Sequence, residues 1–576
     1  AAGSGDVIFA DGADTGTQAT KVGGLVVSGK NLTLRNVYSS GAVEFTATGT
    51  ITTNSSYITD GASITFTGDT VFNHNTIVDT TDGGSNTGGA NVTFTGTIDG
   101  DGVNLPSTLT VSAGTAGDVD FQDLVGDAVA LGAVTINNAK DVTFNGLRAE
   151  SLAQTTGAGT TTFNLGDFTS GTDQAIGTTG ALGVNVTAAA ITINNRVDAT
   201  DGVVTLDANG GLLTLDANAD IIADFAVSLT GSSGISTAGD ITTSGDNLFF
   251  NSAVTLTGDV DIDTADGNIT FGSTIDGGFA LGLTAGTGTV TLSGVAGTSD
   301  GDAGELASLT VNSASAASLK NVFTTGAQAI TADAITLAGS SYASDSTVAY
   351  TGQVTLSQAS TAIAGTTVTF NDTLDSSVTS STSDSDNLTI TGNAVFNELV
   401  GDGAALGNLS VSGTTALNGD GTNAMVVTTT GSQTYSNAVT LANTTTLIGA
   451  AINLNAGASS TGAGQFTITN SGLLTIAANT ALTLGGGFVQ NGAGLVELGG
   501  DITTTDDEIT FATGVTLIDD VTLATQTTTD EGEGITFSST LDSGLDGSNN
   551  AFDLTLGTGK GDVLFTGEVG GTGRLG

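Results

Sequence analysis

Apolar and polar residues alternate in short runs along most of this 576-residue chain. In residues 92–95, 109–112, 134–137 and 142–145, Val, Ile, Leu or Phe takes every second position, and Thr, Ser or Asn the positions between. Runs with this period of two predict half-buried β-strands. Clusters of Gly, Asp and Asn, such as Asp-Gly-Asp-Gly at 99–102, separate the runs and predict turns.

One stretch, residues 218–229, spaces its apolar residues as a helix would. It contains the β-branched Ile221, Ile222 and Val227 and lacks a capping box, so we expect no helix there. The strands recur about every 8 to 12 residues, which an array of immunoglobulin-like sandwiches would also show. The chain has one Pro and lacks Trp or Tyr core markers at fixed intervals, so a stack of parallel-paired coils is favoured.

Related segments recur at long intervals. A segment near Gly117-Asp118-Val119-Asp120-Phe121 has a relative at 394–411, and weaker copies start near residues 5, 290 and 561. Alternate aligned positions lie 283, 275 and 273 residues apart, which defines a super-repeat of roughly 275–283 residues. We therefore expect residues 1–576 to form one continuous β-solenoid of about two super-repeats, with loops of variable length. The aligned positions are Phe9, Phe121, Leu292, Phe396 and Phe565. A second anchor, Phe-x3-Ile/Leu-Asp, ends at Asp99, Asp276, Asp375 and Asp542.

The charge balance limits the partners. Nine Lys and Arg oppose 58 Asp and Glu, a net charge of −49, so no basic patch is available for nucleic acid. This acidity favours solubility, repulsion between neighbouring fibres and a weak general attraction for divalent cations. The chain has no Cys, hence no disulfide. No apolar run approaches the roughly 18 residues of a membrane helix, so we expect no membrane insertion. The first four residues show no charged or apolar region of an export signal, so we expect that any signal peptide has been removed or lies upstream.

Candidate catalytic chemistry is sparse. The single histidine, His74, has no Cys or second His for a zinc site, and no serine lies in a nucleophile elbow, so we expect an exposed loop histidine. Polysaccharide-cleaving β-helices need clustered carboxylates together with Arg or Lys. We predict no catalytic, cofactor-binding or metal-binding residues and no enzyme activity, because the basic residues are scattered singly. They are Lys21, Lys30, Arg35, Lys140, Arg148, Arg196, Lys320, Lys560 and Arg574.

Calcium is the one cofactor for which the sequence offers a candidate binding segment. Residues 259–267 (Asp-Val-Asp-Ile-Asp-Thr-Ala-Asp-Gly) place carboxylates at alternate positions, as a hard-cation loop would. The EF-hand pattern fails, since Thr264 takes its sixth position and Thr270 its twelfth. Val260 and Ile262 between the acids fit a strand with an acidic outer face better.

Two Thr-rich segments carry a resemblance to a known family. Residues 427–441 (VTTTGSQTYSNAVTL) and 323–331 (FTTGAQAIT) resemble repeats of the large filamentous-haemagglutinin-like exoproteins. The resemblance covers essentially the whole chain through low-complexity motifs. It implies a right-handed parallel β-helix, secretion across a Gram-negative outer membrane, an extracellular location on the cell surface, and a role in adhesion or surface coating.

Three functions follow as expectations. The first is a structural, non-catalytic stalk or fibre segment of a surface adhesin, a rod on the order of 130 Å long at about 20 residues per coil. Its receptors would be glycans of host cells, neighbouring cells or surfaces. Residues 1–20 align with 557–576, and neither end shows the polar cap that solenoids normally carry. The second is therefore a filament or sheath subunit that polymerises end to end with itself, and the chain is either such a subunit or a window of a longer array. The third is a carbohydrate-active β-helix.

Overall fold

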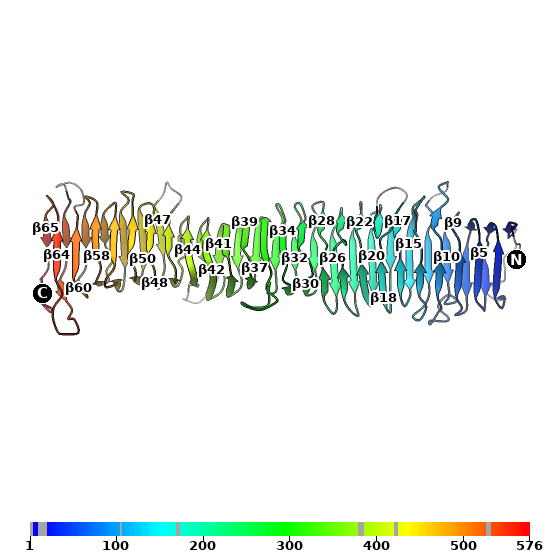
Figure 1. Ribbon diagram of the computed structural model, residues 1–576, viewed down its shortest axis with the longest axis horizontal. Helices are drawn as coiled ribbons and strands as arrows, with labels where there is room; N and C mark the ends of the chain where they lie inside the picture. The colour runs from blue at the N-terminus through cyan, green and yellow to red at the C-terminus, as the bar shows by residue number, and fades with distance from the viewer. Residues whose placement is uncertain are drawn as a thin grey trace. The chain divides into compact units, whose positions relative to one another are not determined.

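The described part of the chain is built from parallel β-strands. The computed structural model describes residues 4–9, 20–103, 106–168, 173–377, 385–419, 424–525 and 532–576, and within them every element is a strand and none is a helix (Figure 1). The chain divides into two compact units, Ala1–Gly294 and Val295–Gly576. Each unit is a stack of coils joined by parallel pairing, so the prediction of an all-β solenoid is confirmed. A single continuous solenoid of two super-repeats stays a prediction.

From residue 160 to residue 292, each coil of the first unit contributes three strands, and each of these strands pairs with the strand three places later along the chain. In-register partners run from Val184 through Val204, Val227 and Leu248 to Ile269, so one coil takes about 20 residues, as the sequence led us to expect. The pattern is set by β18 (Thr160–Phe163), β19 (Ile176–Thr178), β20 (Val184–Ala188), β21 (Ala190–Ile193), β22 (Val197–Ala199) and β23 (Val204–Ala208), which pair as β18–β21, β19–β22 and β20–β23.

Alternation along each strand sorts the side chains. In β23, Val204, Leu206 and Ala208 are buried while Thr205 and Asp207 are partly exposed. Because successive side chains of a strand point to opposite faces, the apolar set fills the coil interior and the Thr and Asp set covers the outside. The stretch predicted not to be a helix forms β25 (Ile221–Ala223) and β26 (Val227–Gly231).

One face of the first unit is a 12-stranded sheet with a column of phenylalanines beneath it. Neighbouring rings of Phe66, Phe94, Phe121, Phe144 and Phe163 lie 4.5–5.5 Å apart and nearly parallel. Stacking like residues on like is what parallel in-register pairing imposes. The sheet consists of β2 (Leu25–Gly29), β5 (Val43–Ala47), β8 (Ile64–Thr67), β11 (Val92–Phe94), β14 (Val119–Phe121), β16 (Val142–Phe144), β18, β21, β24 (Leu213–Leu215), β27 (Ile235–Thr237), β30 (Val254–Leu256) and β33 (Ile275–Asp276).

The second unit repeats this packing with its own aromatic columns. Phe370 lies between Tyr350 and Phe396 at 5.4 Å from each, and Phe537 lies 5.3 Å from both Phe511 and Phe565. A seven-stranded sheet forms one face of this unit. Its strands are β47 (Met425–Thr428), β50 (Thr445–Gly449), β53 (Phe466–Asn470), β56 (Phe488–Gln490), β59 (Ile509–Phe511), β62 (Ile535–Phe537) and β65 (Val563–Phe565).

Several strands of the second unit run unbroken across two faces. The register shifts between Ala364 and Thr367 where β42 (Ser360–Phe370) pairs with β44 (Asn387–Phe396), so the bend is made without leaving the ladder. Gly352 in β41 (Thr347–Leu356) and Gly392 in β44 have φ values of 126° and 120° at such bends. Only glycine adopts this conformation without strain.

Coil length varies because the corners vary. Within the first unit, the in-register partners Ile64 and Val92 lie further apart along the chain than the partners Val142 and Thr161 do. The extra residues lie in corner loops, as the sequence predicted. In the loop at 79–90, the buried Asp79 carboxylate accepts hydrogen bonds from the N–H groups of Thr81 and Gly83. Most of the N-terminal segment that aligns with 557–576 lies outside the described residues.

Three of the four aspartates of the second sequence anchor, those other than Asp276, share one contact. The carboxylate of Asp99 accepts the N–H groups of Ala128 and Val129, 29 and 30 residues further along the chain. Two other copies make the matching pair of bonds, Asp375 with Gly403 and Ala404, and Asp542 with Thr572 and Gly573. The motif therefore fastens a corner loop of the next coil to the strand that carries the aspartate.

Candidate functional site

His74 lies in an exposed loop, as predicted. It follows β9 (Thr70–Phe72), and its backbone carbonyl accepts a hydrogen bond from the Thr76 hydroxyl at 3.2 Å. The loop is held to the next coil by Asn75, whose side-chain oxygen accepts the N–H of Thr108. The hydrogen bonds beside this histidine are of the kind that hold a corner loop between two strands of the solenoid.

The acidic run at 259–267 lies on β31 (Val260–Asp263) and the turn after it. Val260 and Ile262 are buried, while Asp261 and Asp263 are exposed. The strand with an acidic outer face, weighed against a calcium loop in the sequence, is therefore confirmed.

The carboxylates of this run point to separate backbone groups. Asp259 accepts the N–H of Ala280 at 2.9 Å, and Asp263 accepts the N–H of Ala265 at 2.8 Å. Hydrogen bonds from the N–H and hydroxyl of Thr287 lower the pKa of Asp266. In the part of the chain that the structure describes, no three His, Cys, Asp or Glu side chains are grouped so that they could hold a metal ion.

Asp259 is one example of a general corner contact. A side-chain oxygen of Asp or Asn at the end of one coil accepts a backbone N–H of the next coil, as Asp220 does from Asp240 and Asp240 from Asp261. Elsewhere the amides link to one another, with Asn397 between Asn371 and Asn418 at 2.8 Å from each. The Asp and Asn side chains accept hydrogen bonds from backbone N–H groups at the corners, where the chain passes from one sheet to the next. Several aspartates thus have a structural role at the corners, which asparagines share at other corners.

The structure gathers several acids and one base in a shallow groove on the first unit. This acidic groove has a volume of about 270 Å³ and lies over β11, β14 and β16. Lys140 approaches it from the side and forms ion pairs with Asp118 (3.5 Å) and Asp141 (2.5 Å). The sequence, in which the basic residues are scattered singly, did not indicate this grouping. The groove is lined by Asn91, Thr93, Asp118, Val119, Asp120, Asp141 and Thr143.

Two acids of this groove, Asp141 and Asp120, form hydrogen bonds with neighbouring residues. Burial raises the pKa of Asp141, but hydrogen bonds from Lys140 and from the N–H of Thr160 outweigh it, so this pKa is lowered overall. Asp120 accepts a bond from the Gln122 amide at 2.7 Å. A glycosidase needs one acid whose pKa is raised so that it can protonate the leaving group. The pKa of Asp141 is shifted in the opposite direction, so this acid lacks that feature.

Burial and hydrogen bonding also compete at the anchor aspartates. At Asp99 burial is the larger effect and raises the pKa, although two N–H groups donate to the carboxylate. At Asp542 the N–H groups of Thr572 and Gly573 are the larger effect and lower the pKa. The same contact therefore has opposite electrostatic results, depending on how much protein covers it.

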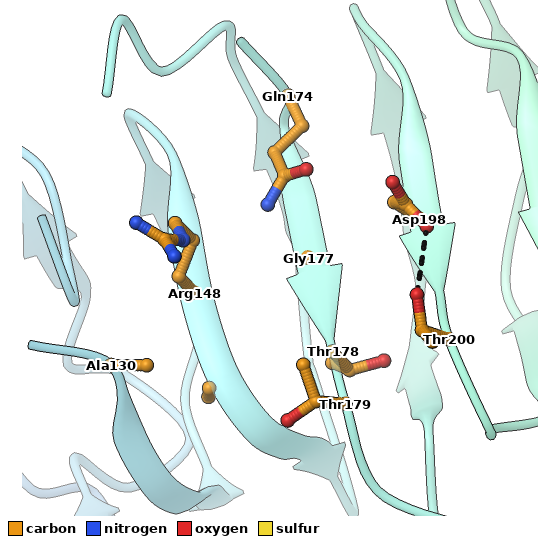
Figure 2. A pocket seen from close by; sticks show the side chains of 9 residues that line it. Ala130, Arg148, Gln174, Gly177, Thr178, Thr179, Asp198 and Thr200 are labelled. Atoms are coloured by element: carbon orange, nitrogen blue, oxygen red, sulfur yellow. Dashed lines mark hydrogen bonds between the residues drawn. The ribbon is translucent and has the colours of Figure 1, made fainter. Parts of the chain in front are cut away.

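A second hollow, which we name the Arg148 notch, lies on another face of the first unit (Figure 2). Arg148 of β17 (Leu147–Gln154), Gly177 of β19 and Asp198 of β22 are in register on three successive coils, with their positions facing outward. Gly177 has no side chain, and the carboxamide of Gln174 lies over it, since a Cβ at Gly177 would be 1.7 Å from Nε2 of Gln174. The notch has a volume of about 190 Å³ and is lined by Ala130, Arg148, Ala149, Gln174, Gly177, Thr178, Thr179, Asp198 and Thr200.

Both ends of the notch are held in place. The Arg148 guanidinium lies 5.5 Å from the centre of the Phe168 ring and donates to the carbonyl of Asp127 at 3.3 Å. Asp198 accepts hydrogen bonds from Arg196 at 2.6 Å and from the Thr200 hydroxyl at 3.3 Å. Sequence reasoning missed this site, because Arg148, Gly177 and Asp198 stand on three separate coils and only the register between coils brings them together.

No family of proteins, no curated protein and no solved structure matches this chain. Within the described residues there is no helix long and apolar enough to cross a membrane. The class to which the chain belongs is given by its own coordinates. It is a parallel β-solenoid repeat protein.

Proposed function

We propose that this chain is a structural, non-catalytic segment of an extracellular stalk or fibre on the surface of a Gram-negative bacterium. It belongs, on this proposal, to a surface adhesin of the filamentous-haemagglutinin-like type. The observation that carries the proposal is the continuous in-register pairing within each unit. Such a stack has its backbone hydrogen bonds along one direction, which suits a rigid spacer.

The composition of the outer surface is consistent with a rigid spacer that does not associate with other copies of the chain. Along one face of the first unit, the outward positions from Thr143 through Thr192 to Thr255 carry short hydroxylated side chains in a single column. The net charge of −49 adds mutual repulsion between copies at neutral pH. The resemblance of residues 427–441 to repeats of the large exoproteins supports the surface location and the adhesin type.

Electron microscopy of the purified chain tests the stalk. We expect isolated thin rods at neutral pH and moderate salt, because a stack of coils is long and narrow and like charges keep the rods apart. Continuous filaments with an axial repeat would instead favour a polymerising subunit, and compact round particles would refute both. Release of reducing ends from acidic or neutral polysaccharides by the same preparation would restore the enzyme hypothesis.

A further inference from the structure

We propose that the second unit carries a contact surface for a second copy of this chain, with the two copies side by side and pointing in the same direction. The stalk function does not require this contact, so the two proposals stand separately. The inference rests on a group of coils without charge, and on exposed leucines and a groove at one corner of these coils.

The coils from β47 to β56 carry no charge, and we name them the uncharged belt (described residues 424–496). Charged residues make up 12% of the chain, yet residues 421–496 contain no Asp, Glu, Lys or Arg. The belt extends over three coil steps, from Met425 through Thr445 and Phe466 to Phe488. Since the net charge of −49 lies outside this stretch, two copies repel each other least where their belts meet.

One corner of the uncharged belt exposes two leucines, which we name the leucine ridge. Leu473 and Leu495 stand directly before the in-register partners Leu474 and Val496, so they lie side by side on successive coils. Leu495 is 64% exposed and Leu473 is 37% exposed. The coils before and after carry alanine and glycine at this position, so the ridge is short and local.

A groove with a volume of about 200 Å³ lies at the same corner as the leucine ridge. All of its lining residues are uncharged, and Ile448 and Ala493 supply apolar side chains to it. Ser471 and Ala493 of this lining stand two residues before Leu473 and Leu495. The groove residues thus come just before the leucines along each coil, and groove and ridge occupy the two sides of one corner.

The two sides of this corner complement each other in one arrangement of two copies. A two-fold axis parallel to the coil stack keeps each coil at its own level and sets the ridge of each copy against the groove of the other, as in an isologous dimer. A two-fold axis perpendicular to the stack would set ridge against ridge and groove against groove. Parallel copies are therefore the ones whose apolar side chains fill a hollow in the partner.

Charged side chains border the belt without lying in the groove. The Glu508 carboxylate accepts a hydrogen bond from Nε2 of Gln465 at 3.5 Å, at the start of β53, whereas the groove lies at the end of this strand. A contact limited to one corner is much smaller than the roughly 1,600 Å² of a standard interface. We therefore expect a dissociation constant of roughly 0.1–1 mM, so copies stay separate in dilute samples for electron microscopy.

Sedimentation equilibrium of the full chain tests the contact at protein concentrations up to about 1 mM. We expect monomers and dimers in about 1 M salt, where the screening length falls to about 3 Å. Association should be weaker at low salt, because the charges of the other coils then repel. Monomers alone at the highest protein and salt concentrations would overturn the proposal.

Two variants locate the contact. Leu495→Asp should weaken dimerisation about tenfold or more, because it places a charge in the apolar contact. Leu545→Asp is the matched control, since Leu545 is a leucine of the second unit with a similar exposure of 61% outside the belt. It adds the same charge and should dimerise as the native chain does. Unchanged dimerisation of Leu495→Asp, with native circular dichroism, would refute this corner.

Single nitroxide labels report the direction of the two copies. Thr389→Cys and Thr434→Cys lie in one outward column, two coil steps apart, on coils that precede the leucine ridge. Parallel copies keep equal levels, so both labels should give nearly the same distance between copies. In an antiparallel dimer centred on the ridge, the two distances would differ by roughly 10 Å or more, at about 4.8 Å per coil, and the proposal would fail. Rods in electron micrographs would leave the stalk proposal intact whichever result is found.

Discussion

Replacing Phe121 by Ala is expected to loosen the middle of the first unit by about 3–5 kcal/mol, the usual cost of removing a buried phenylalanine ring. Phe121 is fully buried between Phe94 and Phe144, with ring centroids at 5.5 and 4.5 Å. Removal of the ring therefore leaves a cavity between Phe94 and Phe144. The two remaining rings are held by their own strands and cannot move together to fill the cavity. Stability in a repeat stack is local, so the loss should be concentrated in the coils that touch the cavity.

Hydrogen exchange measures this local loss. Amides of β11, β14 and β16 should exchange faster by the factor that corresponds to the lost free energy of opening, while amides of β28 (Ile241–Thr243) keep their native rates. Thr143→Ala is the control, because Thr143 lies on the neighbouring strand and points outward, and it should change the opening free energy by less than about 0.5 kcal/mol. A uniform change over the first unit would contradict the picture of a coil-by-coil stack.

Replacing Gly392 by Ala is expected to destabilise the second unit by more than about 2 kcal/mol, because two costs combine. Its φ of 120° is a conformation that residues with a side chain avoid. A Cβ there would also lie 1.8 Å from the backbone oxygen of Gly365, which lies where the register between β42 and β44 shifts. Relief would require the bend between the two faces to open.

Thermal unfolding followed by circular dichroism compares this variant with Gly462→Ala. Gly462 has an ordinary φ, and its Cβ would only touch the backbone oxygen of Ala442 at 3.4 Å, so the control should melt within a few degrees of the native chain, as a change of about 0.5 kcal/mol would imply. Equal melting temperatures for the two variants would mean that the bend at Gly392 has another geometry.

The strands and their inward faces could be predicted from the sequence because they depend on local alternation. The run at 142–145 and the anchor residues Phe121 and Phe396 lie where the period of two places them, with the aromatic side chains buried in columns. The β-branched residues at 221, 222 and 227 likewise gave strands despite a helical spacing. Each of these outcomes needs only the neighbouring residues.

The surface sites could not be predicted because they depend on register between coils of unequal length. Arg148, Gly177 and Asp198 are neighbours because one coil separates each from the next. The two coils differ in length, so the spacing of these residues in the sequence does not indicate that they are neighbours. The contact of Asp99 with Ala128 has the same character, with its partner 29 residues away in a loop. A shift of one residue in either coil would turn these side chains to the other face, so their meeting is invisible without the strand pairing.

The in-register stacking of coils is tested most directly by pulsed electron paramagnetic resonance on the first unit. The chain has no cysteine, so nitroxide labels can be placed at Thr143→Cys and Thr255→Cys alone, two outward positions of one column that are separated by five coil steps. At about 4.8 Å per strand, we expect a narrow distribution of distances near about 24 Å, which should shorten by about 5 Å when the first label moves to Thr162→Cys. A broad distribution, or a distance that does not change with the number of coils between the labels, would contradict the stacked coils on which the account depends.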